Sequence, residues 1–120
     1  MATELRIPFS LDVVIPRILE IGMAEAPREA CGVIIPDLNS SVDGWIHQLV
    51  NRAENPYDSY VIDPRTITDL LKTPEAWEGS LIWHTHPGGH VGPSQGDMRA
   101  RHPELKYLVV TLPRGEATLF

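Results

Sequence analysis

The most informative stretch of the chain is WHTHPGGHVGPSQGD, residues 83–97. It continues an apolar run, and we predict a strand over Leu81–His86 that ends at Pro87. Side chains alternate between the two faces of a strand, so His84 and His86 project from the same side, roughly 6.6 Å apart along it. Two imidazole rings at this spacing can lean together and bind one metal ion.

The second part of this stretch can return the chain to the two histidines. Gly88, Gly89 and Gly92 make a turn sterically cheap, and Ser94 to Asp97 has the S-x-x-D spacing of a helix N-terminus. Asp97 can supply a third ligand, since zinc binds His nitrogen at about 2.0–2.1 Å and carboxylate oxygen at about 2.0–2.2 Å. Three protein ligands leave a fourth position for water, which is the pattern of a catalytic zinc site.

Each half of this pattern also has an ordinary structural interpretation. Taken alone, His84 and His86 are typical polar residues of a strand. Ser94 and Asp97 alone indicate a capping box, and that role is compatible with ligand binding because a helix start is rigid. The joint spacing of the two halves is much more specific than either half.

The remaining sequence predicts a sheet covered by helices. Strands are expected at residues 5–9, 31–35, 45–50, 81–86, 105–112 and 117–120, with a turn over 36–44. Helices are expected to start near Pro16, at Asp63-Pro64 and at Ser94. The first would end at Pro27, with an apolar face formed by Ile18, Leu19 and Met23. Strands outnumbering helices by about two to one predict one α+β domain over residues 1–120, with a mixed α/β sheet.

The composition excludes several classes of protein. The chain has 120 residues, 42% of them hydrophobic, and a net charge of −6 with histidine neutral. It has no Lys/Arg cluster that would predict a nucleic-acid partner, and no apolar stretch near the roughly 20 residues that cross a bilayer. The first residues, MATELRIPFS, lack the features of a signal peptide, and the single cysteine cannot form an internal disulfide. We therefore expect a cytoplasmic protein that binds neither nucleic acid nor membranes.

The chain resembles the JAB1/MPN/Mov34 metalloproteases. His84, His86, Ser94 and Asp97 match the JAMM motif of that family, H-x-H, seven residues, then S-x-x-D, without gap or insertion. Further elements resemble the family in the same order: the first helix, Glu29, Asn51 and Asp63-Pro64. The resemblance implies a mixed, curved β-sheet flanked by helices, in a cytidine-deaminase-like layout, and a minimal member of prokaryotic or phage type. A zinc site of the cytidine deaminase kind is itself excluded, because it needs a pair of cysteines.

The resemblance also implies a function for each residue of the motif. His84, His86 and Asp97 would bind Zn²⁺, and the reaction would be hydrolysis of a peptide or isopeptide bond. Glu29 would be the general acid/base that takes a proton from water and gives it to the leaving amine. Ser94 would donate a hydrogen bond to the developing oxyanion or orient the water.

Other candidate residues have simpler interpretations. Without the motif, Glu29 would be a solvated charge beside Arg28. His90 lies in the glycine-rich loop, either as a solvated residue or in contact with substrate. Four residues are expected to be structural or buried in the core: Cys31, His47, Trp83 and His102.

The substrate implied by the resemblance is the C-terminal tail of a ubiquitin-like or sulfur-carrier protein. An extended tail can bind beside a sheet edge, and the strand near Ile46–Asn51 and the segment Asn55–Ile62 are the expected places. Three settings stay open: processing of a sulfur carrier, removal of a ubiquitin-like modifier, and phage tail assembly. The alternative function is a non-catalytic, structural component of the same fold, such as a phage tail assembly protein. The uncovered edge of the last strand, Ala117–Phe120, predicts a homodimer or a partner protein.

Overall fold

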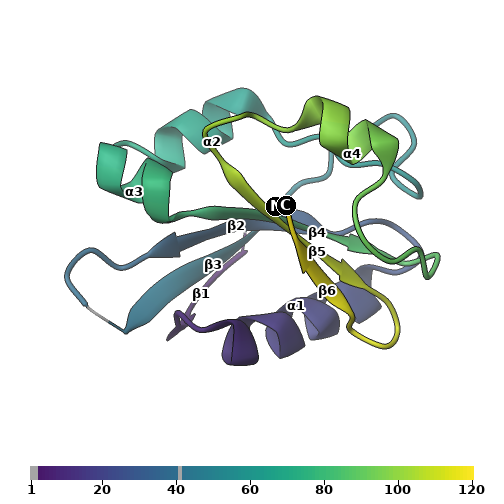
Figure 1. Ribbon diagram of the computed structural model, residues 1–120, viewed down its shortest axis with the longest axis horizontal. Helices are drawn as coiled ribbons and strands as arrows, with labels where there is room; N and C mark the ends of the chain where they lie inside the picture. Colours follow the sequence, from purple (N-terminus) through teal and green to yellow (C-terminus); the bar gives the residue numbers. More distant parts are fainter. Residues whose placement is uncertain (1–2, 41) are drawn as a thin grey trace.

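A six-stranded sheet runs through the molecule in the order β1-β3-β2-β4-β5-β6 (Figure 1). This computed structural model describes residues 3–40 and 42–120. Neighbouring strands are antiparallel except β4 and β5, which are parallel, so the predicted mixed sheet is confirmed. The strands are β1 (Thr3–Pro8), β2 (Cys31–Pro36), β3 (Asp43–Leu49), β4 (Leu81–His86), β5 (Lys106–Thr111) and β6 (Ala117–Leu119).

Helices cover both faces of the sheet. Helix α1 (Leu11–Glu25) lies on one face, whereas α2 (Pro64–Leu70), α3 (Pro74–Gly79) and α4 (Gln95–Ala100) lie on the other (Figure 1). Within the described residues, no helix combines the length and the apolar character that crossing a bilayer requires. Each face has its own buried apolar cluster. The α1 cluster consists of Ile7, Val14, Ile18, Ala30, Ile34, Ile46, Trp83, Leu108 and Val110. The opposite cluster consists of Val33, Ile35, Leu49, Leu71, Ala76, Ile82 and Tyr107.

Strand β4 sends alternate side chains to these two faces. Trp83 belongs to the α1 cluster and is 0% exposed, as predicted for a core residue. Thr85 also points toward α1, where a Cβ atom built on Gly22 would lie 2.7 Å from its methyl carbon. Gly22 therefore allows the helix to approach the strand closely. His84 and His86 project from the other face, as the period of two predicts.

The start of helix α1 differs from the prediction. We expected it near Pro16, but the helix begins at Leu11 and Pro16 lies inside it. The backbone amides of Val13 and Val14 bond to the carbonyl of Ser10 at 3.0 and 2.8 Å, so the first turn closes before the proline. Pro16 is on the exposed side, where water can satisfy the carbonyl that its missing N–H would have bonded.

The apolar face of α1 and the number of helices also differ from expectation. The buried residues of α1 are Val14, Ile18 and Gly22, whereas Met23 is 51% exposed. Helix α3 was not predicted, so the described part of the chain has six strands and four helices, and the expected ratio of two to one is wrong. The start of α3 does carry a local signal, because the side chain of Thr73 accepts a hydrogen bond from the amide of Ala76.

Strands β1 and β6 form the two edges of the sheet. The expectation of a free edge near Ile46–Asn51 is wrong for β3, because β1 pairs with it from Thr3 opposite Gln48 to Pro8 opposite Asp43. The last strand, β6, pairs with β5 within the described residues. The predicted turn over residues 36–44 joins β2 to β3, and residue 41 lies outside the described part.

Candidate metal centre and active site

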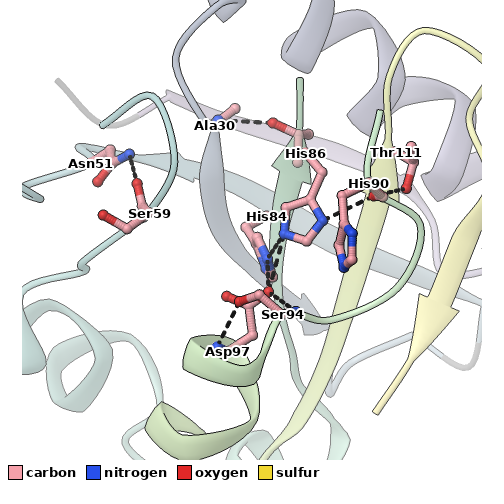
Figure 2. Close-up of polar contacts among 10 residues, drawn as sticks. Ala30, Asn51, Ser59, His84, His86, His90, Ser94, Asp97 and Thr111 are labelled. Carbon is pink, nitrogen blue, oxygen red and sulfur yellow. Dashed lines mark hydrogen bonds and ion pairs between the residues drawn. The ribbon is translucent and has the colours of Figure 1, made fainter. Parts of the chain in front are cut away.

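Three side chains from β4 and α4 converge on one point. His84 Nε2 lies 3.1 Å from His86 Nε2 and 3.0 Å from Asp97 Oδ2, and His86 Nε2 lies 3.1 Å from the same oxygen (Figure 2). Ligands of a tetrahedral ion with bonds of about 2.0–2.1 Å are separated by about 3.3 Å. Neutral imidazole nitrogens and a carboxylate oxygen also offer lone pairs, so the donor set fits a small cation with one position left open.

A backbone carbonyl fixes the orientation of His86. Its Nδ1 lies 3.1 Å from the carbonyl oxygen of His90, and the hydroxyl of Thr111 donates to the same oxygen at 2.8 Å (Figure 2). This contact places a proton on Nδ1 and leaves Nε2 as the ligand atom. Burial lowers the pKa of His86, but hydrogen bonds to Asp97 and to the carbonyl of His90 raise it on balance. The ring of His90 is exposed, so this residue contributes its backbone to the site.

His84 is held by stacking and burial. Its ring lies 4.3 Å from that of Tyr60 with an angle of 23° between the planes, and it is 0% exposed. Burial lowers the pKa of His84 by more than Asp97 raises it, so the neutral, metal-binding form is favoured. Its Nδ1 has no hydrogen-bond partner among the described residues. Tyr60 was not predicted as part of the site, because it is distant from the motif in sequence.

Asp97 uses the same carboxylate to cap the helix and to contact the two histidines. Ser94 Oγ accepts from the amide of Asp97 at 3.0 Å, and Asp97 Oδ2 accepts from the amide of Ser94 at 2.9 Å, which completes a capping box. The capping interpretation of this pair is therefore confirmed, and the same carboxylate also faces the two histidines. Burial alone raises the pKa of Asp97, but hydrogen bonds from His84, His86 and Ser94 hold it well below its usual range.

The glycine-rich loop makes the turn that the sequence predicted. Gly89 and Gly92 have φ angles of 85° and 81°, which lie in the left-handed region that glycine tolerates best. Gly88 does not adopt a positive φ. The loop thereby brings α4 back to the end of β4.

Glu29 is buried next to the two histidines. It lies between α1 and β2, is 4% exposed, and offers a carboxylate oxygen within 4.8 Å of ligand atoms of His84 and His86. The alternative of a solvated charge beside Arg28 is therefore wrong. Burial raises the pKa of Glu29 to about 7, and its Oε1 has no partner among the described residues. A carboxylate with this pKa can accept and return a proton near neutral pH.

The remaining candidate residues take structural positions. Cys31 is buried, and burial raises the pKa of its thiol to about 12, so it carries no thiolate chemistry. His47 is buried on β3, with its Nδ1 3.8 Å from a carboxylate oxygen of Glu4. His102 packs edge-on against Trp77 with ring centres 5.5 Å apart.

A groove of about 570 Å³ leads away from the metal centre. Ser94 and Asp97 line one part of it, and the segment from Asp58 to Ile62 forms another wall. Further lining residues come from α2, α3, the sheet and the connection between α4 and β5: Ile67, Thr68, Trp77, Ile82, His102, Leu105 and Tyr107. The groove therefore offers a partly apolar channel next to the converging ligands.

Comparison with known proteins agrees with this geometry. Residues 12–119 match the family described as prokaryotic homologs of the JAB domain. The chain belongs to this family. The JAB domain is also similar to the desampylase of Haloferax volcanii, with 28% identity over 110 residues, covering 89% of this chain and 78% of the relative. The resemblance seen in the sequence motif is thus confirmed at the level of the family, and the JAB domain holds a site that could bind a metal ion.

Proposed function

We propose that this JAB domain is a zinc-dependent isopeptidase that hydrolyses the bond at the C-terminal tail of a ubiquitin-like or sulfur-carrier protein. One observation carries the proposal. Two histidine nitrogens and one carboxylate oxygen converge within 3.1 Å of one another, and the buried carboxylate of Glu29 lies beside them. Three ligands with a neighbouring buried base are what hydrolysis by an activated water requires.

The residues of the chain have distinct functions in this proposal. His84, His86 and Asp97 would hold Zn²⁺, which would supply Lewis acidity and lower the pKa of a water molecule to about 7. Glu29 accepts the water proton and then donates it to the leaving amine. Ser94 accepts a hydrogen bond from the amide of Asp97, which leaves its hydroxyl hydrogen free to stabilise the developing oxyanion.

The groove beside the metal centre suits an extended tail. Ser59 and Val61 bond to Asn51 through their backbone groups, and the carbonyl of Val61 accepts from the amide of Arg52. Tyr60 lies between them, and no bond from its amide or carbonyl is made within residues 3–40 and 42–120. A substrate strand can pair with those two groups. The predicted docking place at Asn55–Ile62 therefore remains part of the proposal.

The relative narrows the substrate class. The similar protein from Haloferax volcanii is named a desampylase, and we extend the removal of a ubiquitin-like modifier to this chain. A ubiquitin-like protein joined through its C-terminal glycine to a lysine side chain is thus the substrate to test first. The alternative of a structural component predicts metal binding without turnover of any such conjugate.

The test is cleavage of that conjugate by the purified chain after loading with zinc. We expect about one zinc per chain and release of the intact modifier. Glu29→Ala should keep the zinc and lose the hydrolysis, whereas Asp97→Ala should lose both. Glu25→Ala, at an exposed position in the last turn of α1, is the matched control and should behave as wild type. Unchanged hydrolysis by Glu29→Ala would show that Glu29 is not the base, and zinc well below one per chain would count against the metal site.

A further inference from the structure

Asn51 links the proposed base to the wall of the groove. Its side-chain nitrogen donates to the carbonyl of Glu29 at 3.0 Å and to the carbonyl of Ser59 at 3.0 Å. Its side-chain oxygen accepts from the amides of Ala53 at 3.0 Å and Val61 at 3.1 Å. Figure 2 shows the bond to Ser59, on the segment that borders the groove. One side chain therefore joins two segments that are distant in sequence.

The four hydrogen bonds made by Asn51 require a side chain with a primary amide. An asparagine side chain has two donor hydrogens and an acceptor oxygen with two lone pairs, and Asn51 uses all four. An aspartate would keep the two acceptor contacts but lose both donors. The side chain is half-buried, so water does not easily replace the lost bonds.

Glu29 depends on such backbone contacts for its position. Its Oε1 has no partner among the described residues, whereas the backbone that carries the side chain makes hydrogen bonds to neighbouring segments. The amide of Glu29 donates to the carbonyl of Pro56 at 2.7 Å, and Pro56 belongs to the same loop that Asn51 closes. On the other side, the amide of Ala30 donates to Thr85 Oγ1 at 2.9 Å.

The same bonds also position His84 indirectly. Ser59 and Val61 flank Tyr60, whose ring stacks on His84. Contacts of Asn51 thus reach the base, the groove wall and the aromatic ring that covers a ligand. The loop from residue 50 to residue 63 has no helix or strand of its own, so these side-chain bonds replace the backbone ladder that a regular element would supply.

We propose that Asn51 is the positioning residue of this site. Its side-chain amide links the backbone of Glu29 to the groove wall, so the base keeps a fixed position relative to the bound tail. The catalytic consequence rests on the proposed function, whereas the structural link does not.

Hydrogen exchange tests the structural link in the full chain loaded with zinc. Asn51→Ala should lose exchange protection at the amides of Glu29 and Val61. The matched control is Asn55→Ala in the same loop, because Asn55 accepts a local bond from the amide of Tyr57. It should leave both amides protected. Equal protection of Glu29 and Val61 in wild type and Asn51→Ala would overturn the proposal.

Steady-state kinetics on the ubiquitin-like conjugate test the catalytic consequence. Asn51→Asp retains the acceptor bonds from the amides of Ala53 and Val61 and removes the donor bonds to the carbonyls of Glu29 and Ser59. We expect kcat to fall by about tenfold to a hundredfold, since small displacements of a catalytic group have effects of this size, with zinc stoichiometry unchanged. A wild-type kcat in Asn51→Asp would refute the positioning role. A wild-type chain that cleaves no conjugate would refute the proposed function instead, while the exchange data would still decide the link.

Discussion

Strand β4 sends alternate side chains to the two faces of the sheet, and the surroundings of these side chains differ between the two faces. Toward α1, Trp83 lies in a closed apolar cluster and is 0% exposed. Toward α4, the next residue, His84, is equally buried but belongs to a cluster of ionisable groups with Glu29 and Asp97. Buried polar groups cost free energy unless they are paired. The face toward α1 therefore stabilises the fold, whereas burying ionisable groups on the face toward α4 lowers the stability.

The largest effect that separates the two faces is expected at Trp83. Trp83→Ala leaves a cavity in the α1 cluster and should lower the free energy of unfolding by about 3–5 kcal/mol. Trp45→Ala on β3, where the side chain is half-exposed, should cost much less. Urea unfolding of both variants with a chelator present measures the difference. Equal losses would show that the α1 cluster does not dominate stability.

On the opposite face of the sheet, replacing the buried acid Glu29 is expected to raise the free energy of unfolding. Burial raises the pKa of Glu29 from 4.5 to about 7, so the folded state favours the neutral acid. That preference is present in full below pH 4.5 and is lost as the pH rises through about 7, where the fold must bury a charge. Glu29→Gln should therefore stabilise the zinc-free protein by about 3 kcal/mol at pH 8, from a pKa difference of about 2.5 units. Urea unfolding of the two proteins in chelator at pH 8 measures this gain.

The pH dependence distinguishes this gain from better packing. At pH 4 the stability of Glu29→Gln should equal that of wild type, because both side chains are then neutral. Glu25→Gln in an exposed position is the matched control and should change little at either pH. A gain from Glu29→Gln that persisted at pH 4 would contradict the electrostatic explanation.

The smallest effect is expected at Thr111, which reaches the proposed ligand His86 through the carbonyl of His90. Thr111→Val keeps the shape of the side chain but removes the hydroxyl that donates to the carbonyl of His90. Because that carbonyl orients His86, zinc affinity should fall by about tenfold, the lower end of effects seen for outer partners. Competition with a coloured chelator measures the affinity, and Thr118→Val on β6 is the control. No change in affinity would show that His86 is oriented by its burial alone.

The sequence predicted the parts of the site that depend on local spacing. His84 and His86 share a face because of the strand period, and Asp97 follows from the capping motif with Ser94. The mixed sheet was predicted for a similar reason, since apolar runs mark its strands. Glu29 was placed by resemblance, and its burial could not be inferred from its charged neighbour Arg28.

The missed features depend on contacts between distant segments. Tyr60 stacks on His84, and Thr111 bonds the carbonyl of His90, but no local pattern marks either pair. The start of α1 was missed because Pro16 is a common first residue of helices, whereas here its exposed position makes it tolerable inside one. Helix α3 was missed although Thr73 and Pro74 gave a recognisable start.

The capping box of Ser94 and Asp97 has a consequence for the order in which the site forms. All three converging ligands lie between residues 84 and 97, and the cap shapes the last of them locally. Contacts of short sequence separation form early because they close small loops. The three side chains can thus come together before the whole sheet has formed, and Glu29, which is distant in sequence, completes the proposed site only when β2 pairs with β4.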